Sequence, residues 1–344
     1  MISEITQDYM KPQKSRLFCP MEGTMTKMFF SLVDYRNNYF TSNDPNKIIE
    51  FYNGFENRDQ LIQWMKERPK GVANIHEIDG DKNIIVVIPT ADFNGKYAKE
   101  CRENIFKGLH MVFVESGGIG DFYFNIAHNV NVGIRKTMEY NPKWIVFSGD
   151  DMYGIDPISV LIQELNKIDP KDYSSAFTDP PGIYHSTYGR LKKRKNIGSY
   201  LLSLISKEHN LIEPILDKFA VKYIPAGKER FYSRLFYKKA LEVRMIQSFG
   251  IFSGYWIGKN GPMIYDEVFI NNAEDSEVSI LLSLDGSKTA QVHYKIGEFI
   301  GKTLGKGIIR ALRGCASLVY FNEKLTCIIS RNSNNLDFIV EKRR

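Results

Sequence analysis

Three short runs of aliphatic and aromatic residues constrain the fold of this 344-residue chain more than any other feature. They are Ile84–Ile88 (IIVVI), Met111–Val114 (MVFV) and Trp144–Phe147 (WIVF). A run that is apolar throughout is typical of a strand buried on both faces of a parallel sheet. Segments with helical periodicity separate the runs, at residues 97–106 and at about 121–140. We therefore predict an α/β fold with a doubly wound, mostly parallel sheet flanked by helices.

Polar or glycine-containing residues follow each predicted strand. Pro89 and Thr90 follow the first, Glu115 follows the second, and Gly149 and Asp150 follow the third. Ligands of open α/β sheets bind beyond the carboxyl ends of the strands, and parallel strands share that edge. We therefore expect these residues to line one crevice.

Asp150 and Asp151 are adjacent carboxylates, and two like charges side by side call for a partner. Such a pair suits Mg²⁺ or Mn²⁺ when substrate phosphates complete the coordination shell. Taken alone, the pair is better explained as capping of the helix that follows, because adjacent aspartates after a strand are common.

Three other positions have both a chemical and a structural explanation. Glu274 and Asp275 begin a predicted helix, where one could act as a general base or both could favour the helix dipole. His293 could ligate a metal or contact a diphosphate, or it could be an ordinary core or surface residue. Glu115, before Gly117 and Gly118, could accept a hydrogen bond from a nucleotide base or belong to a plain turn.

The composition limits the kinds of partner that the protein can bind and the cellular compartment in which we expect it. A net charge of +6 is compatible with phosphate-bearing substrates, and it is too mild to predict a nucleic-acid partner. The four cysteines form no CxxC pair, which argues against a zinc site or a disulfide framework. The first residues are polar and no run of eighteen apolar residues occurs. We expect a cytoplasmic protein, or one bound to the cytoplasmic face of a membrane.

Taken in order, the motifs of residues 83–332 resemble those of the family 2 glycosyltransferases of GT-A fold. Ile84–Thr90 (IIVVIPT) is similar to the opening strand and turn of that family, and Glu115 stands at its base-reading acid. Residues 130–134 (VNVGI) resemble its Arg-Asn-x-Gly-Ile helix signature, with Val130 in place of arginine. Residues 147–151 (FSGDD) resemble its Asp-x-Asp metal motif, with Ser148 in place of the first aspartate.

The second half of the chain carries further matches. Residues 262–269 (PMIYDEVF) resemble the Gly-Phe-Asp-Glu-x-Phe segment of the family, and Glu274-Asp275 resembles its Glu-Asp pair. Val292-His293 resembles a Val-x-His element near the metal, and residues 329–332 (ISRN) resemble a closing Arg-Asn motif.

The resemblance implies an inverting, metal-assisted transfer of a sugar from a nucleotide-diphosphate sugar to a hydroxyl of a glycan, lipid-linked or protein acceptor. Asp275, with Glu274 beside it, would be the catalytic base. Mn²⁺ or Mg²⁺ would lie at Asp150, Asp151 and His293. The donor would contact Pro89, Thr90, Glu115, Gly149 and Asp150.

The predicted organisation has three parts: an N-terminal accessory region (1–80), a GT-A domain (81–293) and a C-terminal amphipathic helix with a tail (294–344). The domain divides into a nucleotide-binding half (81–156) and an acceptor half (157–293). Residues 294–321 mix apolar and basic side chains. They could lie on a membrane or pack on the catalytic domain, and the pattern leaves both open.

Smaller elements are also predicted. Asn57 should cap a short helix through Leu61 and Met65. Residues 27–35 have strand character, residues 201–205 have helical character, and residues 179–196 read as a long loop with a basic cluster at 190–195.

Two other functions remain as alternatives. A nucleotidyltransferase of similar topology would prefer a glycine-rich, basic loop after the first strand, and residues 91–96 (ADFNGK) match that poorly. A degenerate transferase that only binds sugar nucleotides is favoured by Ser148 and Val130 and opposed by Glu274-Asp275.

Overall fold

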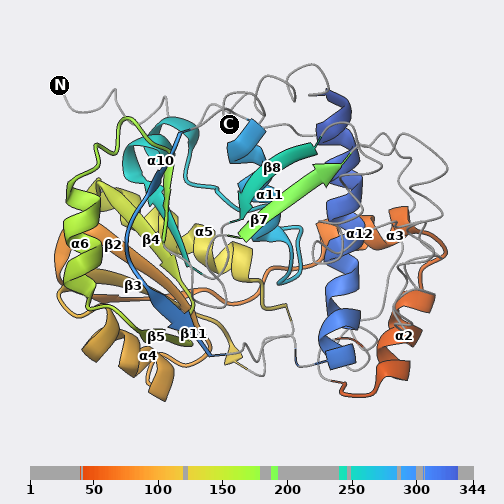
Figure 1. Ribbon diagram of the computed structural model, residues 1–344. Helices are drawn as coiled ribbons and strands as arrows, with labels where there is room; N and C mark the ends of the chain where they lie inside the picture. Colours follow the sequence, from red (N-terminus) through yellow and green to blue (C-terminus); the bar gives the residue numbers. More distant parts are fainter. Residues whose placement is uncertain are drawn as a thin grey trace, which may run out of the picture.

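The computed structural model describes residue 39 and residues 42–118, 123–178, 187–192, 240–245, 249–284, 288–299, 305 and 307–331. The predicted strand at 27–35, the predicted helix at 201–205, residues 193–195 of the basic cluster and the tail from 332 onward lie outside these ranges. The described residues form an α/β fold around a seven-stranded mixed sheet, with helices on its flanks (Figure 1).

The strand order of the central sheet is β1-β3-β2-β4-β9-β6-β10. Two strands, β1 (Asn74–Ile78) and β9 (Phe249–Ser253), run antiparallel to their neighbours. The others share one direction: β2 (Asp81–Thr90), β3 (Leu109–Glu115), β4 (Trp144–Ser148), β6 (Ser175–Phe177) and β10 (Thr289–Gln291). The predicted α/β class with a largely parallel sheet is confirmed.

Strand β2 is buried on both faces, as its continuous apolar sequence predicts. Successive side chains of a strand point to opposite faces, so Ile84, Val86 and Ile88 share one face, and Ile85 and Val87 share the other. All five are almost completely buried.

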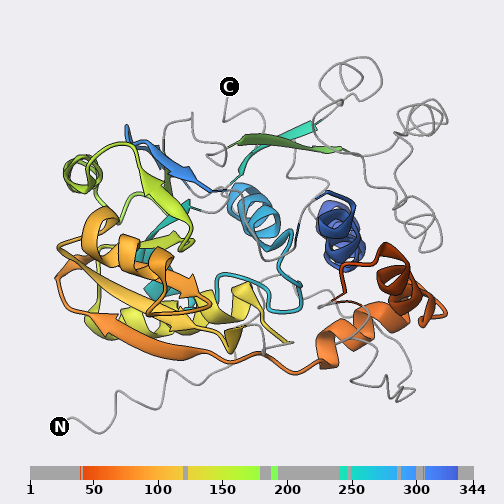
Figure 2. The same ribbon diagram turned by 90° about the horizontal axis from the view of Figure 1, so that it is seen from below.

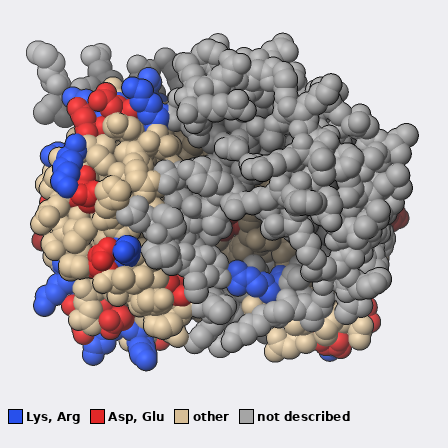
Figure 3. Space-filling model, viewed as in Figure 1, with Lys and Arg blue, Asp and Glu red and all other residues tan. Residues whose placement is uncertain are grey.

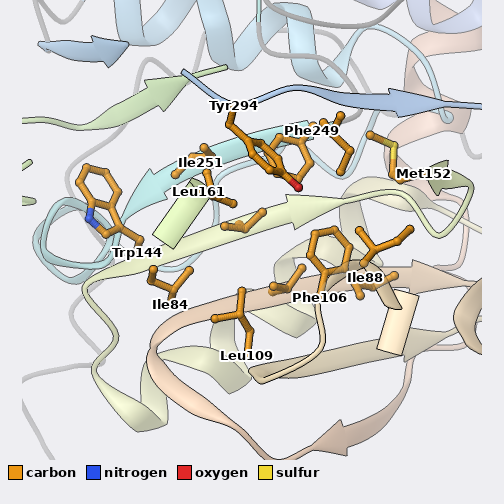
Figure 4. Packing of buried hydrophobic residues seen from close by; sticks show 14 of the residues in the cluster. Ile84, Ile88, Phe106, Leu109, Trp144, Met152, Leu161, Phe249, Ile251 and Tyr294 are labelled. Carbon is orange, nitrogen blue, oxygen red and sulfur yellow. The ribbon is translucent and has the colours of Figure 1, made fainter. Parts of the chain in front are cut away.

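Helices cover the two faces of the sheet separately. The first face carries α4 (Lys96–Glu100), the π-helical turn after it and α6 (Ile158–Asn166); Figure 4 shows Ile84 and Ile88 packed there with Phe106 and Leu161. The second face carries α5 (Ile126–Thr137), α10 (Gly254–Asn260) and α11 (Glu274–Leu284).

Two sequence predictions were wrong: the start of one helix, and a segment that was expected to be a loop throughout. Helix α5 begins at Ile126, not near 121, because the Asn125 side chain accepts a hydrogen bond from the backbone of His128 and caps the first turn. The predicted loop at 179–196 contains strand β7 (Thr187–Lys192), which pairs antiparallel with β8 (Ala240–Met245). That partner lies far along the chain, so local sequence does not reveal the pairing.

The predicted N-terminal and C-terminal regions pack together. Helices α2 (Pro45–Asn53) and α3 (Arg58–Glu67) lie against α12 (Gly307–Arg331), and α11 lies between α12 and the sheet (Figures 1 and 2). The predicted cap of α3 is confirmed, since Asn57 accepts hydrogen bonds from the backbone of Asp59 and Gln60.

A mainly aromatic and aliphatic core joins α2, α3 and α12. From α12 it takes Leu312, Cys315, Ala316 and Val319, all buried against residues of α2, α3 and the segment 269–273. The apolar face of α12 therefore packs on protein, mainly on the N-terminal helices α2 and α3 and also on residues 269–273 of the predicted catalytic domain. The helix begins at Gly307, because the first part of the predicted amphipathic segment contains strand β11 (Ile296–Glu298). Within the described parts of the chain, no helix is long and apolar enough to cross a bilayer.

Strand pairing joins the predicted parts of the chain on both sides of residues 80 and 293. Strand β1 pairs with β3 in the central sheet, and β11 (Ile296–Glu298) pairs with β5 (Met152–Gly154) just after the predicted metal motif.

Candidate active site

The strand order places a topological switch point between β2 and β4. The chain passes from β2 to β3 on one side and then returns to β4 on the other side of β2. Pairing of β2 with β4 ends at Val87 and Phe147, whereas pairing of β2 with β3 continues to Thr90 and Glu115. The two strands therefore separate at their carboxyl ends, where open α/β sheets bind ligands.

The separation also explains Pro89 in a central strand. A proline has no N–H to donate, which would normally break a ladder. Pro89 lies beyond the last residue of β2 that pairs with β4, and it remains aligned with Val114 on β3. The missing donor therefore costs little at this position.

Thr90 and Asp150 meet across the switch point. The Thr90 hydroxyl lies 2.7 Å from Oδ2 of Asp150 and donates to it. Burial raises the pKa of Asp150, and the hydrogen bond from Thr90 opposes that rise. Two residues predicted separately from two strand ends are thus in direct contact.

Asp151 and Gly149 lie beside this contact. The backbone carbonyl of Asp151 accepts a hydrogen bond of 2.8 Å from the backbone of Phe299, just after β11. A Cβ atom on Gly149 would lie 2.9 Å from Oδ1 of Asp151, so a larger residue would disturb that carboxylate. That carboxylate is the end of a flexible side chain, so the substitution would move Asp151 without necessarily disturbing the backbone.

Glu115 is held by two donors that the sequence did not indicate. Its Oε1 accepts the backbone N–H of Phe93 at 2.8 Å, and its Oε2 lies 2.9 Å from Nε2 of His76. The Phe93 hydrogen bond and then His76 keep the pKa of Glu115 below its usual value. The His76 ring also stacks on Phe93, with centroids 4.3 Å apart. His76 belongs to β1, and no motif marks it in the sequence.

Glu274 and Asp275 begin α11. Burial and the neighbouring Asp275 raise the pKa of Glu274 to about 8. Oε2 of Glu274 is buried and has no hydrogen-bond partner in the described part of the chain. Burial, and then the charges of Asp275 and Glu274, also raise the pKa of Tyr265. The Tyr265 ring packs edge-on against Phe147 of β4, with centroids 5.8 Å apart, which links the acidic pair to that strand.

The Asn-x-Gly part of the helix motif has a structural role. Asn131 is fully buried; its Oδ1 accepts the backbone N–H groups of Ile264 and Tyr265, and its Nδ2 donates to the carbonyl of Tyr265. A Cβ atom on Gly133 would lie only 2.4 Å from Cγ1 of Val87. The motif thus joins α5 both to β2 and to the segment before α11.

His293 contacts helix α6 through its backbone. Its side chain is exposed, and its backbone N–H donates to Oε2 of Glu164 on α6 at 3.1 Å. Among the described residues, no three His, Cys, Asp or Glu side chains are grouped so as to hold a metal ion.

The residues at the switch point nevertheless fit a hard cation. Asp150 offers a carboxylate whose oxygen is already oriented by Thr90, and Asp151 is adjacent in sequence. Mg²⁺ in particular is commonly held by one or two carboxylates, with substrate phosphates and water as the remaining ligands.

Charges on the described surface are mixed. Figure 3 shows basic and acidic side chains interspersed over the part formed by the sheet and its helices. On that face, the described residues form no stripe of basic charge of the kind that follows a nucleic-acid backbone.

No known family model matches the chain, and comparison with curated proteins finds no similar sequence.

Proposed function

We propose that the protein is a glycosyltransferase that moves a sugar, with inversion, from a nucleotide-diphosphate sugar to an acceptor hydroxyl. The observation that carries the proposal is the Thr90–Asp150 contact across the switch point, with Glu115 on the adjacent strand end. These are residues that the family resemblance assigns to the donor, and they lie at or just after the ends of three different strands.

The acidic pair supports the acceptor half of the proposal. An inverting transfer needs one base, and Asp275 is the candidate because Glu274 beside it has a raised pKa and remains protonated near neutral pH. A neutral Glu274 leaves the negative charge on its neighbour, which is the division of roles expected for two adjacent carboxyl groups.

The reaction proceeds by one displacement. Asp275 takes the proton of the acceptor hydroxyl as its oxygen forms a bond to the anomeric carbon. The bond from that carbon to the phosphate oxygen breaks, and its electron pair leaves with the nucleoside diphosphate. Because attack and departure occur on opposite faces, the configuration of the carbon inverts.

A divalent cation, when bound, would neutralise charge on the leaving diphosphate. Asp150 is the residue best placed to hold it, with Asp151 next to it, and Thr90 would orient the Asp150 carboxylate. Glu115, held by His76 and Phe93, would meet the nucleotide base.

The test has two stages. Thermal unfolding is measured with UDP-, GDP- and dTDP-sugars, with and without Mn²⁺, and then donors that stabilise the protein are assayed for turnover by mass spectrometry. We expect at least one donor to stabilise the protein and to be consumed. Asp275→Asn should abolish turnover while keeping donor stabilisation, whereas Asp150→Asn should lose both.

Loss of donor binding in Asp275→Asn would contradict the assignment of the base. Stabilisation without turnover in the wild-type protein would favour a binding scaffold instead, and an absence of both would refute the proposal.

A further inference from the structure

The segment 264–273, which leads into Glu274 and Asp275, is held by three parts of the chain that are remote from it in sequence. We propose that Arg68, directly after α3, and Ser317 on α12 are positioning residues that fix this segment and thereby the acidic pair. The catalytic part of this inference rests on the proposed function, whereas the structural part can be tested without it.

The N-terminal region supplies two cations. Nη2 of Arg68 donates to the carbonyl of Phe269 at 3.1 Å, and Nζ of Lys70 donates to the carbonyl of Glu267 at 2.7 Å. Arg68 is only 4% exposed, and its Nε and Nη1 atoms are buried without a hydrogen-bond partner in the described part of the chain. Burying the Arg68 guanidinium for a single carbonyl contact costs folding free energy. This cost points to a role for Arg68 other than stabilising the fold.

Helix α12 holds the next part of the segment. The Ser317 hydroxyl, which is fully buried, accepts the backbone N–H of Ile270 at 2.8 Å and lies 3.2 Å from its carbonyl. Farther along the helix, Nζ of Lys324 contacts both Asp266 and Glu277, each at 2.6 Å. Lys324 thus ties the segment to α11.

Helix α5 holds the segment from the sheet side. Nδ2 of Asn125 donates to the carbonyls of Glu267 and Phe269, at 2.7 and 3.2 Å. Nδ1 of His128 lies 2.9 Å from Oε2 of Glu267. The Phe269 carbonyl therefore receives donors from both α5 and the N-terminal region.

The backbone at the end of the segment is in an unusual conformation. Asn271 has φ +52° and Ala273 has φ +70°, and alanine rarely adopts this left-handed region. Such conformations persist only where the surroundings impose them, and they gather at functional sites. Ala273 directly precedes Glu274, and its carbonyl accepts the backbone N–H of Glu277 in the first turn of α11. The direction in which the acidic pair points is therefore set where the contacts from α3, α5 and α12 converge.

The variants follow from these contacts. Arg68→Met removes the donor to Phe269, and Arg68→Lys keeps a cationic donor of similar reach. Ala273→Gly removes the strain of the left-handed backbone at this position. Because glycine adopts many other backbone conformations as readily, the turn is then less firmly fixed. Arg58→Met is the matched control, because Arg58 is a partly exposed arginine at the start of α3, and it contacts Glu323 on α12 instead of the segment.

The first readout needs no substrate. Hydrogen exchange of the backbone amides of residues 264–277 is measured by mass spectrometry for each variant. We expect at least tenfold faster exchange in Arg68→Met and Ala273→Gly, partial recovery in Arg68→Lys, and wild-type exchange in Arg58→Met. Wild-type exchange in both Arg68→Met and Ala273→Gly would overturn the inference.

The second readout is hydrolysis of UDP-glucose, GDP-mannose and dTDP-glucose, with water in place of the acceptor. For any donor that the wild-type protein cleaves, kcat should fall roughly tenfold to a hundredfold in Arg68→Met and Ala273→Gly, with donor KM unchanged. Unchanged kcat in both would also overturn the inference.

If Arg68→Met does not fold, Ser317→Ala replaces it with the same expectations and the same refuting results. If the wild-type protein cleaves none of the three donors, the proposed function loses support, while the exchange data still decide whether these residues hold the segment.

Discussion

The Thr90 hydroxyl donates to Oδ2 of Asp150 over 2.7 Å, joining the ends of β2 and β4 where the two strands have ceased to pair. The bond favours the ionised form of Asp150, against the effect of burial. The contact between the two strand ends therefore also favours the negative charge that a cation would meet there.

We predict that Thr90→Val shifts cation binding to higher pH. Without the hydroxyl, burial acts on Asp150 unopposed and its pKa rises further. A carboxylate holds a cation only when it is ionised, so the midpoint of Mn²⁺ binding should move upward in pH. Calorimetric titrations with Mn²⁺ between pH 5 and pH 8 measure the midpoint. Thr137→Val is the control, because the Thr137 hydroxyl bonds a carbonyl within its own helix; equal midpoints in all three proteins would contradict the prediction.

We predict that Glu274→Gln stabilises the protein increasingly as pH rises. The pKa of Glu274 is raised to about 8 in the folded protein, so the folded state binds the proton more tightly than the unfolded chain does. The wild type therefore loses stability as pH rises from the ordinary glutamate range towards 8, and the neutral glutamine does not. Urea denaturation at pH 5, 6.5 and 8 should show a growing stability difference in favour of the variant. A difference that does not change with pH would show that Glu274 is already ionised.

We predict that Gly133→Ala destabilises the protein by about 1–3 kcal/mol, the usual cost of overpacking a core. The added methyl group would meet Val87 at 2.4 Å, in the packing of α5 on β2. Urea denaturation measures the loss. Gly258→Ala on α10 is the matched control, because its Cβ would make only an ordinary contact of 3.5 Å with Met138; that variant should be neutral or slightly more stable. Equal effects at the two positions would contradict the packing described for Gly133.

We predict that Lys324→Met destabilises the protein by about 3–5 kcal/mol, as expected when one partner of a buried ion pair is removed. Burial acts to raise the pKa of Asp266, but Lys324, together with the backbone N–H of Val268 and the Tyr320 hydroxyl, brings the pKa below its usual value. Without Lys324, the carboxylates of Asp266 and Glu277 would remain close together without their cation. Lys99→Met removes an exposed partner of Glu103 and should change stability by less than about 1 kcal/mol. A small loss in Lys324→Met would show that solvent reaches the network.

The sequence by itself determined the α/β class, the central strands and the cap of α3, because these depend on local patterns. Ile84–Ile88 must be buried on both faces wherever it lies, and Asn57 caps the helix that directly follows it. The same reasoning placed Thr90 and Asp150 at strand ends, and the parallel direction of those strands brought them to one edge.

Only the tertiary structure decided which remote residues meet there. His76 reaches Glu115 because β1 pairs with β3, and His293 contacts Glu164 because of the path that the chain takes after β10. The hydrogen bonds from Arg68 and Ser317 to the segment 264–273 depend on the packing of α3 and α12, which are more than two hundred residues apart in sequence. Hydrophobic periodicity predicts which side of a helix is buried but not its partner, since burial of apolar area is non-directional. The core shared by α2, α3 and α12, and the left-handed turn at Ala273 beside it, are therefore features that only the folded chain shows.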